Sequence, residues 1–282
     1  MEKAIILSPS QARRPGTLKL IKGATVYLGD EFCIHKQPSF ADFIAVRDLT
    51  GKAPVLLSTL LTEPALEKYK KLLAECAKKA PRTEIVVNDL GLLTFINKNY
   101  RGRFSITPGR LLTYLFDPRN TRVLGSRSDD EQDGRKMKVW EDSLEATPTP
   151  YIKRFLKRYA VERVETDSER IFEKYAGNTK VKISYHYPMR LMAMTRFCPF
   201  AGGIVPECKA PCGTRLLKLN TRQLDYQLFS KGNAYFARNK PLKHPRLDRL
   251  VEMSLTPSPG FELFRNKYCC PDGPETARGM CA

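Results

Sequence analysis

Three cysteines in one short segment carry the sharpest chemical signal of the chain. Cys198, Cys208 and Cys212 lie within fifteen residues, in MTRFCPFAGGIVPECKAPCG, where proline and glycine allow the chain to fold back around one centre. All-thiolate ligation selects zinc or an iron–sulfur cluster. Zinc sites usually use paired Cys-x2-Cys turns, and the segment has no such pair. The spacing therefore favours an iron–sulfur cluster, with zinc as the alternative and buried, unliganded cysteines as the plainer one.

The remaining cysteines bear on the compartment. The chain has eight cysteines in 282 residues, too long a chain for a small disulfide scaffold, and its first apolar run is too short for a signal peptide. We expect a cytoplasmic protein whose thiols serve metal or redox chemistry. Cys76 is predicted to lie in a helix core. The role of Cys269, Cys270 and Cys281 stays open.

Composition sets limits on the class of protein. Hydrophobic residues make up 42% and charged residues 28%, a globular balance that excludes a fibrous or disordered chain. No run approaches the ~18 apolar residues of a membrane span. The 48 Lys+Arg against 30 Asp+Glu give a net charge of +18, which favours anionic partners such as nucleic acid, dicarboxylates or an acidic protein, or simply keeps the surface soluble.

Strands and helices alternate along the chain. Strand patterns occupy 24–28, 54–58, 84–88, 103–107, 161–165 and 181–185, helical patterns occupy 63–79, 109–115 and 168–174, and 227–236 and 250–255 are candidates for the last strands. This rhythm predicts an α/β fold with a (β/α)8 TIM-barrel-like sheet, complete or distorted. An open doubly wound sheet is the alternative, but no GxGxxG follows the first strand.

The domain organisation follows from the same pattern. Residues 1–256 are predicted to form the barrel, interrupted at about 118–150 by an insertion rich in Arg, Asp and Gly that reads as a lid, and 257–282 form a loop-like tail. In an α/β barrel the carboxyl ends of all strands open on one face, where active sites are built. Cys33 follows the strand at 24–28, so it can meet Cys198, Cys208 and Cys212 on that face and complete four thiolates.

These residues resemble the collagenase-like peptidase family (peptidase family U-thirty-two), and within it the UbiV-like branch. The matching stretches are VYLGDEFC (26–33), VLLSTL (55–60), VVNDLGLL (86–93), LMAMTRFCPF (191–200) and CKAPC (208–212). The resemblance implies a barrel fold and a [4Fe–4S] cluster on Cys33, Cys198, Cys208 and Cys212. It also implies oxygen-independent hydroxylation in ubiquinone biosynthesis beside a UbiU-like paralogue in a heterodimer, with prephenate as the oxygen donor.

The substrate-binding residues are less defined. Candidates near the strand ends are Asn88, Asp89, Thr107, Arg110, Glu165, Asp167 and Arg196. Each has a structural alternative: Asn88 and Asp89 can cap the following helix, and Arg110 can balance surface charge. Arg196, two residues from Cys198, is the first candidate.

Three other functions stay open. Other branches of the same family modify tRNA or rRNA, and YIKRFLKRY (151–159) could stack on bases, although its aromatic residues fit a helix core better. A non-catalytic iron–sulfur scaffold is a second alternative. Classical protease activity is the weakest, because the chain has only three histidines and neither HExxH nor GxSxG.

Overall fold

The computed structural model describes residues 1–14, 16–21, 23–113, 150–204, 208–210, 212, 216–219 and 226–253. The predicted insertion at about 118–150 lies outside these residues except for its last position. The predicted tail at 257–282, with Cys269, Cys270 and Cys281, lies outside them entirely. No helix among the described residues is long and apolar enough to cross a membrane.

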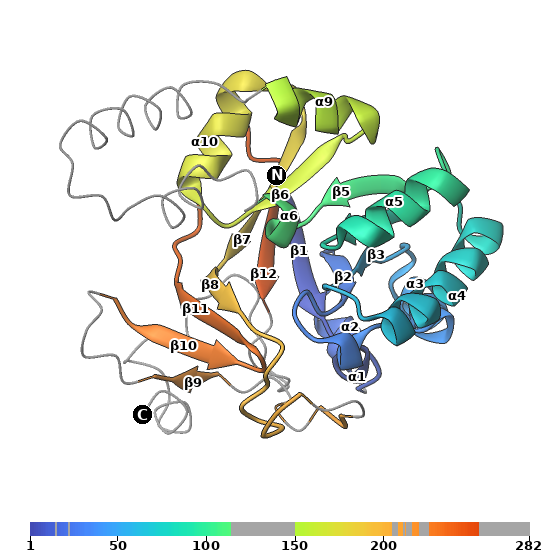
Figure 1. Cartoon of the computed structure of the whole chain (residues 1–282), viewed down its shortest axis with the longest axis vertical. Coiled ribbons are helices and arrows are strands. Elements are labelled where there is room, and N and C mark those ends of the chain that lie inside the picture. Colours follow the sequence, from blue (N-terminus) through green and yellow to red (C-terminus); the bar gives the residue numbers. More distant parts are fainter. Residues whose placement is uncertain are drawn as a thin grey trace.

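Eight parallel strands form a nearly closed barrel, which confirms the predicted fold class in a distorted form. The strands are β1 (Glu2–Leu7), β2 (Thr25–Gly29), β3 (Val55–Leu57), β4 (Glu84–Val87), β5 (Ser105–Pro108), β6 (Arg163–Thr166), β7 (Lys182–Tyr187) and β12 (Arg249–Met253). They run around the barrel in chain order, and β12 pairs with β1, the two lying side by side in red and blue in Figure 1. The ladder is open between β5 and β6.

Helices connect most of these strands. They are α1 (Pro9–Ala12), α2 (Thr17–Leu20), α3 (Phe40–Thr50), α4 (Glu63–Lys79), α5 (Leu90–Asn99), α6 (Arg110–Thr113), α9 (Pro150–Arg158) and α10 (Glu169–Asn178). The longest, α4, has the predicted bounds, because Tyr69, Leu72 and Cys76 recur at helical spacing and are all buried against the sheet. Thr113 of α6 donates a hydrogen bond to the Glu165 carbonyl oxygen at 2.7 Å and so bridges the open seam.

A second sheet replaces the helix between β7 and β12. It is antiparallel, in the order β8 (Met189–Met194), β11 (Ala234–Arg238), β10 (Leu228–Lys231), β9 (Leu217–Lys218), and it lies beside the barrel at the lower left of Figure 1. The expectation that 227–236 forms a barrel strand is therefore wrong. Gly232, at φ +61°, turns this segment into a hairpin between β10 and β11.

The barrel strand that the sequence patterns missed is β1. Its residues Ala4, Ile5, Ile6 and Leu7 are all buried, because a parallel barrel strand is covered by helices on one face and by the barrel interior on the other. Such a strand shows an unbroken apolar run instead of an alternating pattern. With β1 in place, β12 is sufficient to close the count at eight.

Candidate metal centre

The four predicted cysteine ligands line one cavity. Cys33 follows β2, and Cys198, Cys208 and Cys212 belong to the connection between β8 and β9. All four border the same cavity of about 100 Å³ at the carboxyl-end face of the barrel. Their thiols are free, with Cys212 almost fully buried and the others partly exposed. Residues more than 160 positions apart in the sequence thus share one space.

Backbone hydrogen bonds fix the loop that carries Cys33. Asp30 Oδ1 accepts the amide protons of Phe32 at 2.9 Å and Cys33 at 3.0 Å. Asn233, in the β10–β11 turn, donates to the Phe32 carbonyl oxygen at 2.9 Å and to that of Thr195 at 2.6 Å. The loop after β2 is therefore held to the antiparallel sheet that brings in the other three cysteines.

Apolar packing holds the same two parts together. The Phe32 ring meets the Phe236 ring of β11 edge-on, with centroids 5.3 Å apart. Both belong to a buried cluster that is separate from the main core and also contains Met189, Leu191, Phe229, Ala234 and Met253. The cysteine cavity thus lies where the barrel and the antiparallel sheet pack against each other.

The segments around the other cysteines are tight turns. The Cys198 amide donates to the Gly203 carbonyl oxygen at 3.0 Å, and the Gly203 amide donates back at 3.2 Å. Cys208 Sγ accepts the Ala210 amide proton at 3.3 Å. The Cys212 thiol is hydrogen-bonded by the buried ammonium of Lys36. The Ala210 amide and the Lys36 ammonium thus both donate to cysteine sulfur, as outer-shell groups do around metal ligands.

The cysteine sulfurs of the described residues are not spaced as the ligands of one zinc ion. At Zn–S bonds of about 2.3 Å, tetrahedral zinc holds its thiolates about 3.8 Å from one another, and no three cysteine sulfurs within the described ranges lie within 4.8 Å of one another. In a [4Fe–4S] cluster each thiolate binds a different iron, so the sulfurs lie farther apart. Burial, and then the Asp30 carboxylate, raises the pKa of Cys33 to about 12, so the positive charge of bound metal is needed to keep its thiolate.

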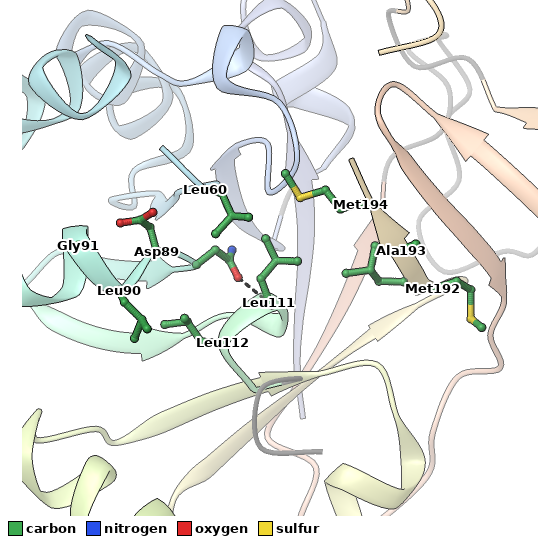
Figure 2. Close-up of a pocket in the computed structure, with 11 residues that line it drawn as sticks. Leu60, Asp89, Leu90, Gly91, Leu111, Leu112, Met192, Ala193 and Met194 are labelled. Carbon is green, nitrogen blue, oxygen red and sulfur yellow. Dashed lines mark hydrogen bonds between the residues drawn. The ribbon is translucent and has the colours of Figure 1, made fainter. Parts of the chain in front are cut away.

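An apolar cleft adjoins the cysteine cavity. It has a volume of about 670 Å³ and lies between the loops after β3 and β4, helix α6 and strand β8. Figure 2 shows Leu60, Leu111 and Met194 pointing toward this space from three different elements. Leu60 and Met194 also line the cysteine cavity. The two cavities therefore share a wall.

A basic cavity adjoins the cysteine cavity on another side. Its volume is about 760 Å³, and it shares Ile34, His35 and Cys208 with the cysteine cavity. Its other lining residues include the cationic side chains of Arg13, Lys68, Lys71 and Lys209, against the carboxylates of Asp42 and Glu75. Arg13 is neutralised by Asp42 at 2.6 Å, and Glu75 is paired with Lys79 at 2.9 Å. Lys68, Lys71 and Lys209 form no ion pair with another described residue and can attract an anion.

Two of the predicted substrate residues have structural partners. Asp89 is the N-cap of α5 and accepts the amide protons of Leu92 at 2.7 Å and Leu61 at 3.3 Å. Asn88 donates to the Ser58 carbonyl oxygen at 2.9 Å and accepts the Leu111 amide proton at 3.0 Å. Both line the apolar cleft and hold its walls in place.

Two further candidates lie apart from each other. Arg196 is exposed at the rim of the cysteine cavity, where it can meet an incoming anion. Thr107 is buried in the barrel and donates a hydrogen bond to Glu84 Oε1 at 3.0 Å. Thr107 is therefore engaged away from either cavity.

Arg110 is the centre of a buried ionic network. It is fully buried, so its alternative role of balancing surface charge is wrong. Its guanidinium pairs with both oxygens of Glu31 and with Asp167 Oδ2 at 2.9 Å. Although burial acts in the opposite direction, these two carboxylates raise the pKa of Arg110. Asp167 also accepts the Leu191 amide proton at 2.7 Å, which ties the network to β8.

Glu165 and His186 lie beside this network. His186 Nε2 and Glu165 Oε2 are 2.9 Å apart, and both side chains are buried. Burial raises the pKa of Glu165 to about 7. Burial, with Arg110 as the next cause, lowers the pKa of His186 to about 3. The imidazole is therefore neutral at pH 7, while the carboxyl group is close to its midpoint.

Within the described part of the chain, Glu31, Glu165 and His186 are the one group of three possible metal ligands with donor atoms within 4.8 Å of one another. Both Glu31 oxygens, however, already bond Arg110, whose guanidinium supplies the positive charge that a cation would bring. Sequence reasoning missed Glu31 and His186. The available signals were a carboxylate just beyond a strand and a histidine within the alternation of β7.

A comparison of the chain with protein-family models, curated proteins and solved structures found no match in any of the three.

Proposed function

We propose that this chain is a [4Fe–4S] protein taking part in oxygen-independent hydroxylation, as a UbiV-like subunit that acts with a UbiU-like paralogue. The observation that carries the proposal is the convergence of Cys33, Cys198, Cys208 and Cys212 on one cavity. Such a cluster would supply electron transfer, one electron at a time, next to the bound substrate. The residues of the chain hold it, shield it and shape the spaces on either side.

The neighbouring cavities support the substrate classes. The apolar cleft, walled by leucine and methionine side chains, suits an apolar quinone precursor better than a nucleotide. The lysines of the basic cavity and the exposed Arg196 suit an anionic oxygen donor such as prephenate. An apolar acceptor and an anionic donor would then approach the cluster from different sides. We propose the cytoplasm as the compartment, since cluster assembly needs reduced thiols.

RNA modification is supported less well. In α9 the apolar side chains of Ile152, Phe155 and Leu156 are buried in the main core, so Phe155 is not available to stack on a base. Tyr159 lies partly buried against Phe155, with ring centroids 5.0 Å apart. The basic surface remains as the argument for RNA, and steeply salt-dependent binding of tRNA or rRNA would favour that alternative.

The experiment that tests the hydroxylase assignment uses isotope label. The chain, purified without oxygen together with its paralogue, is incubated with a demethoxylated or dehydroxylated quinone precursor and prephenate labelled with ¹⁸O at its hydroxyl group. We expect labelled product by mass spectrometry. Absence of product from a preparation with a full cluster would contradict catalysis and leave the scaffold alternative.

The apolar cleft gives a matched pair of variants. Leu90 is 51% exposed in the cleft and does not line the cysteine cavity, and Leu49 is 68% exposed on α3, outside both. Leu90→Asp places a charge against the apolar ligand, so we expect at least a tenfold loss of affinity for the quinone precursor with unchanged iron content. Leu49→Asp should leave both unchanged. Equal affinities of the two variants, measured by fluorescence titration, would exclude the cleft as the substrate site.

A further inference from the structure

Two lysines lie close to Cys212, one of the four cysteines that line the cavity. Lys36, the last residue of the 3-10 helix η1 (Ile34–Lys36), is 7% exposed and hydrogen-bonds the Cys212 thiol. Lys231 ends β10 and is partly buried, within electrostatic reach of Cys212 and Lys36. The next residue, Gly232, is against Cys212: a Cβ there would come within 4.0 Å of the sulfur.

The Asp30 carboxylate accompanies these two cations. Asp30 Oδ2 lies 3.8 Å from Lys36 Nζ, and Asp30 is also within electrostatic reach of Lys231. Its other oxygen accepts the amide protons of Phe32 and Cys33. Taken together, these three side chains carry a net positive charge beside Cys212. Burial at the Lys36 side limits screening by water and salt, so this charge acts at short range with little attenuation.

A [4Fe–4S] cluster with four thiolate ligands is negatively charged in both of its common oxidation states and becomes more negative when it is reduced. A fixed cation beside it therefore stabilises the reduced state more than the oxidised state. Hydrogen bonds to the ligand sulfur act in the same direction.

We propose that Lys36 and Lys231 set the reduction potential of the cluster, holding it well above the value it would have without them. The Asp30 carboxylate lowers the potential and so offsets part of their effect. This inference rests on the proposed function, since it requires the cluster. It assigns to the two lysines a positioning and tuning role rather than contact with substrate. The lysines thereby determine how readily the cluster takes up an electron.

The test is the midpoint potential of the cluster in single variants of the full chain. It is measured by anaerobic redox titration, followed by the electron paramagnetic resonance signal of the reduced state, after iron and sulfide have been quantified. For Lys36→Met and Lys231→Met we expect more negative potentials, each shifted by at least a tenfold change in the reduction equilibrium, ~59 mV for one electron. Asp30→Asn keeps an oxygen acceptor for the two amides and should shift the potential the opposite way.

Two controls separate charge from structure. Lys36→Arg keeps the cation and should stay within threefold of the wild-type equilibrium. Lys209→Met removes the same charge next to Cys208, but this side chain is exposed, so water screens it and we expect no more than a threefold change. Opposite signs for Asp30→Asn and Lys36→Met would not arise from general loosening of the site.

The possible results separate a failure of this inference from a failure of the proposed function. A wild-type chain without iron would overturn the proposed function, and this inference with it. A wild-type chain with a full cluster, and lysine variants with a full cluster and unshifted potentials, would overturn this inference alone. If Lys36→Met loses its cluster, Lys231→Met and Asp30→Asn decide, because neither removes the hydrogen bond to Cys212.

Discussion

Among single residues, we expect the buried charged side chains to contribute more to the stability of this molecule than the exposed ones. Arg110, Glu31 and Asp167 form one network with no exposed member, and the Arg110 guanidinium lies 5.4 Å from the centroid of the Phe32 ring, next to Cys33 in the sequence. Arg110 can be buried because two carboxylates and the Met189 carbonyl oxygen accept hydrogen bonds from its guanidinium. Removing one partner leaves the others without compensation.

Arg110→Met should therefore be strongly destabilising. We expect a loss of about 3–5 kcal/mol in the free energy of unfolding, because Glu31 and Asp167 would remain as uncompensated buried carboxylates. Arg47→Met is the matched control, since Arg47 and its partner Asp48 are both exposed, and should cost less than about 1 kcal/mol. Urea unfolding measures both. Similar losses of unfolding free energy in the two variants would show that the buried Arg110 network contributes no more stability than an exposed ion pair.

The Glu165–His186 pair predicts a pH dependence that appears only when the pair is broken. The pKa of Glu165 is about 7 in the folded chain against 4.5 when unfolded, and the pKa of His186 is about 3 against 6.5. The raised carboxyl value favours folding at low pH, and the lowered imidazole value favours it at high pH. Between pH 4.5 and 6.5 the two effects oppose each other and nearly cancel.

Each single variant should expose the slope of the remaining partner. Glu165→Gln leaves His186, so stability should be full above pH 6.5 and fall as the pH drops toward 3. His186→Gln leaves Glu165, so stability should be full below pH 4.5 and fall as the pH rises through 7. Urea midpoints at a series of pH values check both signs. Parallel profiles of the two variants would contradict the assigned pKa directions.

At the scale of elements, close approach of two strands depends on one glycine. Gly29, the last residue of β2, has φ +137°, and a Cβ there would overlap the Leu57 carbonyl oxygen of β3. Gly102 also has positive φ, at +73°, but with open space around it. Only the first position combines backbone strain with a clash against backbone, which cannot move aside.

Gly29→Ala should consequently disturb the barrel far more than Gly102→Ala. We expect about 1 kcal/mol from the unfavourable φ at position 102, and at position 29 a loss several times larger, or an insoluble chain. Thermal unfolding of the two purified variants is the measurement. A Gly29→Ala protein as stable as Gly102→Ala would show that β2 and β3 do not approach as described.

The elements also show which patterns a sequence reveals. The bounds of α4 followed from its amphipathic spacing, and most barrel strands followed from short β-branched runs between turns. The hairpin at Gly232 was misassigned, although Gly232-Asn233 is a recognised turn signal, because two apolar strands and one long apolar strand look alike. The environment of Arg110 could not be foreseen, since its partners Glu31 and Asp167 are 79 and 57 positions away.

For the molecule as a whole, the antiparallel sheet between β7 and β12 explains how the site is assembled. Cys33 belongs to the barrel, whereas Cys198, Cys208 and Cys212 belong to the connection of the antiparallel sheet. Sequence reasoning anticipated that they could share one face, because the carboxyl ends of barrel strands always do. It could not anticipate the apolar and basic cavities on either side, since each is lined by elements that are distant in the sequence.

We propose that these four cysteines together hold one [4Fe–4S] cluster. The direct measurement is iron, sulfide and zinc content, with an absorption spectrum, of anaerobically purified wild-type chain and of five Cys→Ala variants. We predict about four irons and a broad band near ~400 nm in the wild type, lost in the variants at Cys33, Cys198, Cys208 and Cys212 and kept at Cys76, which is buried on α4. A colourless protein, one zinc per chain, or a cluster that survives any of the four substitutions would contradict the account.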